Sequence, residues 1–269
     1  MQMPQVIPVL DLLDNLAVRA VRGERTRYRP IESSLCASSE PLTVAHALLA
    51  TTGARTLYVA DLGAILRQGD HAAHLAALLD ALDTLDALDR EDQAPRHAGG
   101  HGVEIWLDAG FTDFPSMQTL FNRIDSIRCV HGIRPPCCAK LVPVFGTETL
   151  HTIHALREAE AAGFAPLLSL DHRSGRLMSE LSAGRPAPDT SWWPSRVIVM
   201  TLDHVGSYEG PDLDTFAAIR AQAGVRELIG AGGIRHAADL SAAAHSGAAA
   251  WLVASALHDR RLDLRPAKS

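Results

Sequence analysis

The chain has 269 residues, of which 47% are hydrophobic and 21% charged, and its formal net charge is −6. These values are ordinary for a globular protein and exclude the strongly basic composition that general nucleic-acid binding requires. No apolar run approaches the roughly 20 residues of a membrane span, and the N-terminus lacks the features of a secretory signal. Four irregularly spaced cysteines indicate reduced thiols. We therefore expect a cytoplasmic protein that binds neither nucleic acid nor membranes.

Short apolar segments alternate with longer helical patterns from one end of the chain to the other. Most of these segments are continuously apolar, which is typical of parallel strands covered on both faces. The predicted strands are residues 6–10, 56–60, 103–107, 140–145, 165–170, 197–201, 227–229 and 251–253, and the predicted helices include 42–52, 71–89, 148–162, 212–223 and 237–246.

Eight strands with helices between them predict an α/β fold, a single (β/α)8 barrel formed by residues 1–269. An open, doubly wound sheet is the alternative. No Pro/Gly-rich linker divides the chain. The polar segment 80–101 is interpreted as the end of a helix followed by a surface loop. Segment 182–195 is interpreted as a loop, in which Trp192 and Trp193 either pack beneath the loop or stack on a ligand.

Acidic residues stand at the ends of several predicted strands, where the active sites of such barrels lie. Asp11, Asp108 and Asp171 each follow an apolar strand, and neighbouring buried carboxylates shift one another's pKa values so that one serves as acid and another as base. We predict a functional role for Asp11 and Asp171. Asp61 also ends a strand, but a structural role is equally expected for it.

Two turns of small residues follow the seventh and eighth predicted strands. Gly232 and Gly233 allow close backbone approach to an anion, and Ala254 and Ser255 open a helix whose free N–H groups favour negative charge. Phosphate sites in these barrels often lie between the same two loops. The sequence therefore predicts a phosphorylated small-molecule ligand, while tight turn packing is the alternative interpretation.

Three further groups of residues are less specific. Thr201, Asp203 and His204 at the end of the sixth strand are candidates for the substrate pocket. The first loop contains four arginines, Arg22, Arg25, Arg27 and Arg29. There are two interpretations: they close over an anionic ligand, or they form a solvated surface. The cysteines between residues 129 and 138 lack zinc-site spacing, so we expect a loop there, and no metal or cofactor.

These motifs, in this order and spacing, resemble the histidine-biosynthesis barrels, namely the ProFAR isomerase and the imidazole-glycerol-phosphate synthase cyclase (the HisA/HisF family). The resemblance spans nearly the whole chain and implies a TIM barrel of the ribulose-phosphate-binding type. It is carried by IPVLDLLD at 7–14, LYVADLGA at 57–64, SLD at 169–171, GPD at 210–212, AGGI at 231–234 and VASAL at 253–257.

The resemblance implies an acid/base rearrangement of an aminoaldose, with Asp11 as general base and Asp171 as general acid. It also implies an internal half-barrel repeat. The chain departs from the family where Asp108 occupies a turn that is glycine-rich in the isomerase, because a carboxylate there repels a phosphate. Asn15 stands where the family has glycine, which a left-handed backbone tolerates.

We therefore expect an isomerase-type enzyme that is a divergent relative of the ProFAR isomerase and keeps one phosphate site. Related paralogues are associated with methanopterin- and methanofuran-type one-carbon cofactor biosynthesis. A genuine ProFAR isomerase, a related lyase and a non-catalytic phosphate-binding barrel remain alternatives. The sequence does not predict the oligomeric state.

Overall fold

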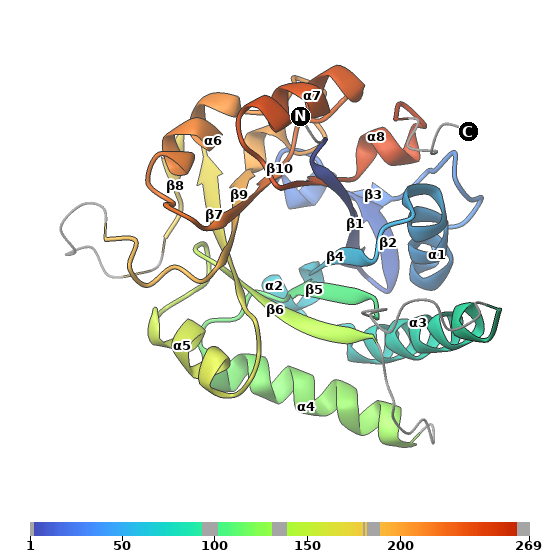
Figure 1. The fold of residues 1–269 in the computed structure, drawn as a ribbon. Coiled ribbons are helices and arrows are strands. Elements are labelled where there is room, and N and C mark those ends of the chain that lie inside the picture. The colour runs from blue at the N-terminus through green and yellow to red at the C-terminus, as the bar shows by residue number, and fades with distance from the viewer. Residues whose placement is uncertain (1–2, 93–101, 131–138, 180, 182–188, 263–269) are drawn as a thin grey trace.

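The computed structural model describes residues 3–92, 102–130, 139–179, 181 and 189–262. Eight parallel strands hydrogen-bond side by side, and the last pairs with the first, so the sheet closes into a barrel. Figure 1 shows the longer helices, such as α1, α3 and α4, outside this ring. The predicted (β/α)8 barrel is confirmed, and the open-sheet alternative is wrong. In barrel order the strands are β1 (Gln5–Leu13), β4 (Thr56–Asp61), β5 (Glu104–Asp108), β6 (Lys140–Gly146), β7 (Leu167–Arg173), β9 (Arg196–Thr201), β10 (Glu227–Ala231) and β11 (Ala250–Val253).

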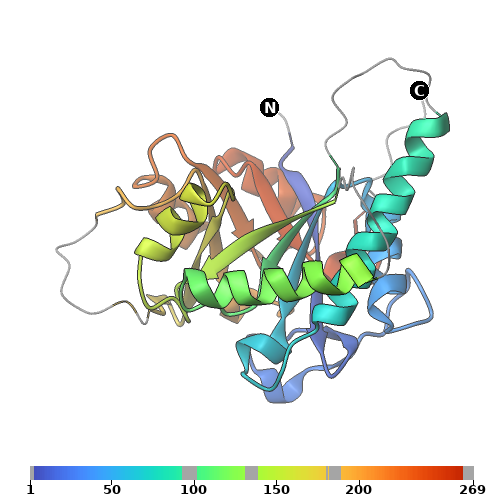
Figure 2. The same cartoon turned by 90° about the horizontal axis from the view of Figure 1, so that it is seen from below.

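Helices cover the outer face of the strands. Helices α3 and α4 lie side by side (Figures 1 and 2), and Arg128 of α4 pairs with Asp80 and Asp83 of α3 at 2.8 and 2.5 Å. None of the described helices is both long and apolar enough to cross a membrane. The helices are α1 (Pro41–Thr52), α2 (Leu62–Ile65), α3 (Ala72–Asp92), α4 (Phe114–Val130), α5 (His154–Ala161), α6 (Leu213–Arg220), α7 (Ala237–His245) and α8 (Ser255–His258).

The ends of α1 follow from local chemistry. The Glu40 carboxylate accepts the backbone N–H groups of Leu42 and Thr43, which have no partner inside the helix. Pro41 occupies the first turn, where a missing N–H costs nothing. Gly53 ends the helix at φ 63°, a left-handed conformation that glycine adopts without a steric penalty. Such signals fix where the chain leaves each helix and re-enters the barrel.

The core has two layers because side chains alternate across each strand. One cluster fills the barrel interior and includes Ile7, Tyr58, Trp106 and Ile198. The other lies between the strands and the helices and is the larger of the two. Every second side chain of a strand therefore points into the interior, and those nearest the carboxyl end of the strand lie at the mouth of the barrel.

Strands β1 and β7 each continue into an antiparallel hairpin, with β2 (Leu16–Arg19) and β8 (Arg176–Leu177) respectively. A short strand β3 (Arg29–Pro30) extends the first hairpin. These are the first and fifth strands of the barrel, so the hairpins are related as the expected half-barrel repeat would relate them. Asn15 lies in the β1–β2 turn at φ 64°, a left-handed conformation that asparagine tolerates in place of glycine.

Some predicted bounds are wrong. The helix predicted at 148–162 begins only at His154, because Thr149 and Leu150 donate their N–H groups to the Gly146 carbonyl and form a turn instead. Cys129 and Val130, predicted to lie in a loop, are the last two residues of α4. Residues 93–101, 131–138 and 182–188 lie outside the described part, including most of the cysteine segment. Trp192 and Trp193 pack against the core, as the packing interpretation expects.

Trp251 connects the strand–helix layer to the turn after β10. Its six-membered ring lies flat against Gly230, so that a Cβ at Gly230 would stand 2.2 Å from the Trp251 ring. The same ring packs on Phe216, with centroids 5.4 Å apart, and the indole N–H donates to the Gly232 carbonyl at 3.0 Å. A glycine is therefore required at position 230 by packing rather than by backbone conformation.

Gly230→Ala is expected to destabilise the protein by about 1–3 kcal/mol, because the buried indole cannot move away from a new methyl group. The free energy of unfolding is measured by chemical denaturation for the wild type, Gly230→Ala, Trp251→Leu and the double variant. The double variant should lose less stability than the sum of the two single variants. Additive losses would contradict the contact.

Candidate active site

A pocket of about 1140 Å³, open solvent at its mouth included, lies at the carboxyl ends of the barrel strands. All eight barrel strands, or the loops that follow them, contribute to its lining. Eight of the ten predicted site residues line this pocket, and their roles remain predictions. They are Asp11, Asp108, Asp171, His204, Gly232, Gly233, Ala254 and Ser255.

Strand alternation brings the three aspartates together. Asp108 follows the inward-facing Trp106 by two residues, and Asp11 follows Ile7 by four, so both carboxylates extend the interior face to the mouth. On β7, Asp171 follows the inward-facing Leu167 by four residues. The signal for the site is therefore an acid at an inward position, rather than an acid at the end of a strand.

Thr201 and Asp203 do not line the pocket. Thr201 is adjacent to Met200, which does line it, so alternation turns Thr201 to the other face. The Asp203 carboxylate accepts the backbone N–H of Ser174 in the β7–β8 turn. His204 lines the pocket, and its Nδ1 donates to the Gly210 carbonyl at 2.6 Å.

Asp61 lies outside the pocket as well and has a structural role. It is completely buried, and its Oδ1 accepts a hydrogen bond from His71 Nδ1 at 2.6 Å. It also accepts the backbone N–H groups of Ala64 and His71, while His71 Nε2 accepts the N–H of Asn15. This network connects the loop after β4 to the β1–β2 turn.

Asp108 and Asp171 each accept one hydrogen bond from their own strand or the turn after it and one from the neighbouring strand or its loop. Asp108 accepts the Tyr58 hydroxyl at 2.9 Å and the N–H of Gly110 at 3.1 Å. Asp171 accepts the Ser169 hydroxyl at 2.7 Å and the N–H of Glu148 at 3.1 Å. Asp11 has no side-chain hydrogen bond with any described residue, so its carboxylate faces the pocket without a fixed partner.

Burial raises the pKa of Asp11 to about 7, and the nearby Asp108 carboxylate adds to the shift. The pKa of Asp171 is also raised to about 7, again by burial first and by Asp108 second, although the Ser169 hydroxyl opposes the shift. Burial likewise raises the pKa of Asp108. Two carboxyl groups that exchange protons near neutral pH are suited to general acid/base catalysis.

Gly146 makes room for these carboxylates at the end of β6. A Cβ at this position would stand 2.8 Å from Asp171 Oδ2 and 3.9 Å from Asp108 Oδ2. A side chain larger than hydrogen would therefore displace Asp171. The space left by Gly146 is part of the pocket.

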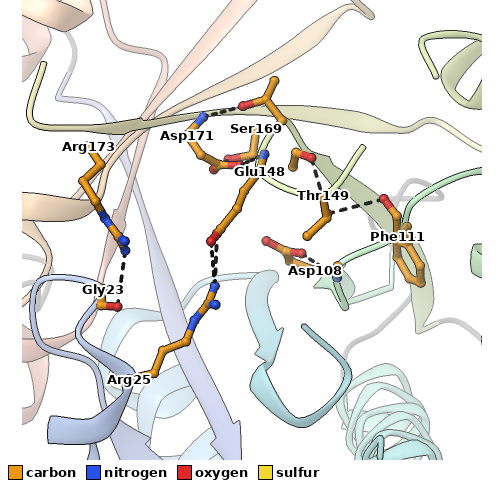
Figure 3. A network of polar contacts seen from close by, with 12 residues as sticks. Gly23, Arg25, Asp108, Phe111, Glu148, Thr149, Ser169, Asp171 and Arg173 are labelled. Atoms are coloured by element: carbon orange, nitrogen blue, oxygen red, sulfur yellow. Dashed lines mark hydrogen bonds and ion pairs between the residues drawn. The ribbon is translucent and has the colours of Figure 1, made fainter. Parts of the chain in front are cut away.

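Arg25, Arg173 and Tyr28 are further polar residues of the lining. Arg25, one of the four arginines of the first loop, pairs with both carboxylate oxygens of Glu148 at 3.0 and 3.2 Å, and Arg173 donates to the Gly23 carbonyl at 3.3 Å (Figure 3). Sequence reasoning did not identify Tyr28 or Tyr58. Tyr58 lies at an inward position and was identifiable by alternation, whereas Tyr28 follows an irregular turn that has no such periodicity.

The glycine turn after β10 has two left-handed residues, Gly232 at φ 90° and Gly233 at φ 84°. A Cβ on Gly233 would stand 2.1 Å from the Gly210 carbonyl oxygen, so packing alone requires glycine there. Gly232 lines the pocket beside Ser255, the first residue of α8. Packing and ligand approach are therefore both compatible with this turn.

Among the described residues, no group of three or more His, Cys, Asp or Glu side chains is arranged to hold a metal ion. The zinc alternative for the cysteine segment falls largely on residues 131–138, outside the described part.

Comparison with known proteins adds two findings. An uncharacterized protein of Methanocaldococcus jannaschii is 28% identical over 265 residues, which cover 97% of this chain and 96% of that protein. Residues 192–263, which contain β9, β10, β11 and the glycine turn, match the family model described as histidine biosynthesis protein. This match and the closed eight-stranded barrel together confirm that the chain resembles the histidine-biosynthesis barrels.

Proposed function

We propose that the protein is an enzyme that rearranges a phosphorylated small molecule by proton transfer, in an isomerase-type reaction of the Amadori kind. One observation carries this proposal: two buried carboxyl groups, on the first and fifth barrel strands, face one pocket with pKa values of about 7. Neither Asp11 nor Asp171 forms an ion pair with a described residue. This argues against a non-catalytic barrel, where such acids would have no use.

In the proposed reaction, Asp11 removes the proton from C2 of an aminoaldose, while Asp171 protonates the ring oxygen and opens the ring. The resulting enol then takes up a proton at C1 and loses the proton of its C2 hydroxyl, which gives the aminoketose. The raised pKa values allow one group to be ionised while the other keeps its proton near neutral pH. The division of roles between the two aspartates follows the family resemblance.

The phosphate would be held on the β10–β11 side of the pocket, beside the strand that carries Asp11, by backbone N–H groups of Gly232, Gly233, Ala254 and Ser255. All four residues line the pocket, and α8 begins at Ser255. Asp108 and His204 line the same space and are proposed to contact the substrate. Thr201 and Asp203 would act only by supporting the loop after β9.

The proposed substrate carries one phosphate rather than two. Asp108 ends β5 and lines the pocket, and two like charges about 4 Å apart repel by about 4 kcal/mol at an effective dielectric constant near 20. This favours a paralogous pathway, such as methanopterin- or methanofuran-type cofactor biosynthesis, over ProFAR isomerisation. Turnover of ProFAR in a spectrophotometric assay would reverse that preference.

The first prediction concerns catalysis. Asp11→Asn and Asp171→Asn are each expected to reduce turnover by about 100-fold or more, because proton transfer by a positioned group contributes at least that much. The measurement is exchange of the C2 proton into D2O, followed by NMR over a set of monophosphorylated aminoaldoses. Asp214→Asn, an exposed acid on α6, is the charge-matched control. Unchanged exchange in Asp11→Asn would contradict the mechanism.

The second prediction concerns pH. kcat/KM should be bell-shaped with both limbs near pH 7, because the active form holds one proton on the Asp11–Asp171 pair. Asp108→Asn removes a charge that raises both pKa values, so its optimum should move to lower pH. A single limb, or an optimum that Asp108→Asn does not move, would be inconsistent with this pair.

The third prediction concerns stability. The folded pKa of Asp11 is raised, so the folded state binds more protons than the unfolded state between about pH 4 and pH 7, and stability falls as pH rises through that range. Asp11→Asn removes this loss. Its midpoint of thermal unfolding should exceed that of the wild type at pH 8 and differ less at pH 5. An equal difference at both pH values would mean that the pKa of Asp11 is not raised.

A further inference from the structure

Asp108 is a third acid beside the proposed proton-transfer pair, and a proton that it holds is lost to that pair. Its carboxylate raises the pKa of both Asp11 and Asp171, second only to burial. Asp108 and Asp171 also face one space, because a Cβ at Gly146 would stand 3.9 Å from Asp108 Oδ2 and 2.8 Å from Asp171 Oδ2. Carboxyl groups arranged in this way titrate as a coupled set and compete for the same proton.

Tyr58 contacts the oxygen of Asp108 for which this competition matters. Strands β4 and β5 are hydrogen-bonded neighbours, and Tyr58 faces the barrel interior from β4. Its hydroxyl donates to Asp108 Oδ2 at 2.9 Å, the same oxygen that faces the space beside Gly146. The N–H of Gly110 donates to the other oxygen, Oδ1, at 3.1 Å. Both oxygens of Asp108 therefore accept a hydrogen bond, and such bonds favour the charged form of a carboxyl group.

Neutral hydrogen bonds, rather than a counter-ion, oppose the effect of burial on Asp108. Burial raises the pKa of Asp108, and the Gly110 N–H and the Tyr58 hydroxyl are the two strongest groups that lower it. Arg25 lowers this pKa as well, but it is paired at 3.0 Å with Glu148, which raises it (Figure 3). The opposing effects of this ion pair leave the two neutral donors to stabilise the carboxylate.

The phenol of Tyr58 remains a donor wherever the aspartates titrate. Burial, and after it the carboxylates of Asp108 and Asp171, raises the pKa of Tyr58 well above its ordinary value. The side chain is buried, so the hydroxyl keeps its proton from acid to alkaline pH. Tyr58 thus donates to Asp108 whatever the protonation state of the neighbouring acids.

We propose, on the basis of the proposed function, that Tyr58 is a positioning residue: its hydroxyl keeps Asp108 in the carboxylate form, so that the proton used in catalysis stays on Asp11 or Asp171. Tyr58 acts in this role through Asp108 and not on the reacting atoms. The ionised Asp108 in turn keeps the pKa values of its two neighbours raised. Without the phenol, Asp108 Oδ2 would be left to share the proton of Asp171 across the space at Gly146.

The test is a pH titration of the ligand-free protein, in which the aspartates carry 13C at the carboxyl carbon and are followed by NMR. Tyr58→Phe and Ser169→Ala are matched variants, because each removes one hydroxyl that donates to one carboxylate, Asp108 or Asp171. Tyr58→Phe should raise the pKa of Asp108 by about one pH unit, since a hydrogen bond to a charged group contributes about that much. Ser169→Ala should raise the pKa of Asp171 and leave that of Asp108 unchanged. Asp→Asn variants of the three acids assign the signals.

Proton exchange gives a second readout that a merely structural role would not move. The pH optimum of C2-proton exchange should be lower in Tyr58→Phe than in the wild type, because a partly protonated Asp108 raises the pKa values of Asp11 and Asp171 less. The change should be smaller than in Asp108→Asn, where the charge is removed completely.

The wild type tests the same contact if Tyr58→Phe does not fold, which circular dichroism would show. With 13C at the hydroxyl-bearing ring carbon of tyrosine, the Tyr58 signal should change as Asp108 ionises, at a lower pH than that at which Asp11 and Asp171 titrate. A Tyr58 signal that does not respond to Asp108 would overturn the inference.

The outcomes separate this inference from the proposed function, because the titration needs no substrate. If Asp11 and Asp171 titrate near pH 7 but Asp108 titrates identically in the wild type and Tyr58→Phe, the role of Tyr58 is overturned and the proposed function stands. An equal change of Asp108 in Ser169→Ala would overturn it too, because loosening of the site would then explain both variants. If Asp11 and Asp171 titrate near their ordinary value of about 4 in the wild type, the pair on which both proposals rest is absent.

Discussion

Closure of the parallel sheet is the constraint on which the site depends. Because β11 pairs with β1, the inward side chains of all eight strands share one interior, and the last of them meet at one mouth. Apolar side chains fill the lower part of this interior. Acids at inward positions near the mouth on β1, β5 and β7 are therefore brought together although they are separated by up to 160 residues in sequence.

Bringing these acids together opposes stability and serves the proposed chemistry at once. Burial, and second to it the nearby Asp108 carboxylate, raises the pKa values of Asp11 and Asp171, and the same free energy weakens the fold at neutral pH. The surrounding hydrogen bonds reduce this cost for Asp171 but not for Asp11. The extensive apolar core of the barrel makes such a concentration of buried carboxyl groups tolerable.

The fold was predictable because continuous apolar strands and interleaved helices are local signals that the barrel does not override. The strand-end acids were predictable too, but only alternation distinguishes Asp11 and Asp108, which face inward, from Asp61, which does not. Tyr28 and the Arg25–Glu148 pair depend on irregular loops meeting across the mouth. Contacts of that kind have no sequence period, so they could not be read from the sequence.

The hydrogen bond from the Trp251 indole to the Gly232 carbonyl has a consequence for recognition. The indole is buried between Gly230 and Phe216, so the turn it holds is ordered by the packing of the last strand before any ligand arrives. The conformational entropy of that turn is lost when the chain folds rather than when a molecule binds. A ligand that contacts the turn thus meets a rigid surface, and small differences in its shape become differences in affinity.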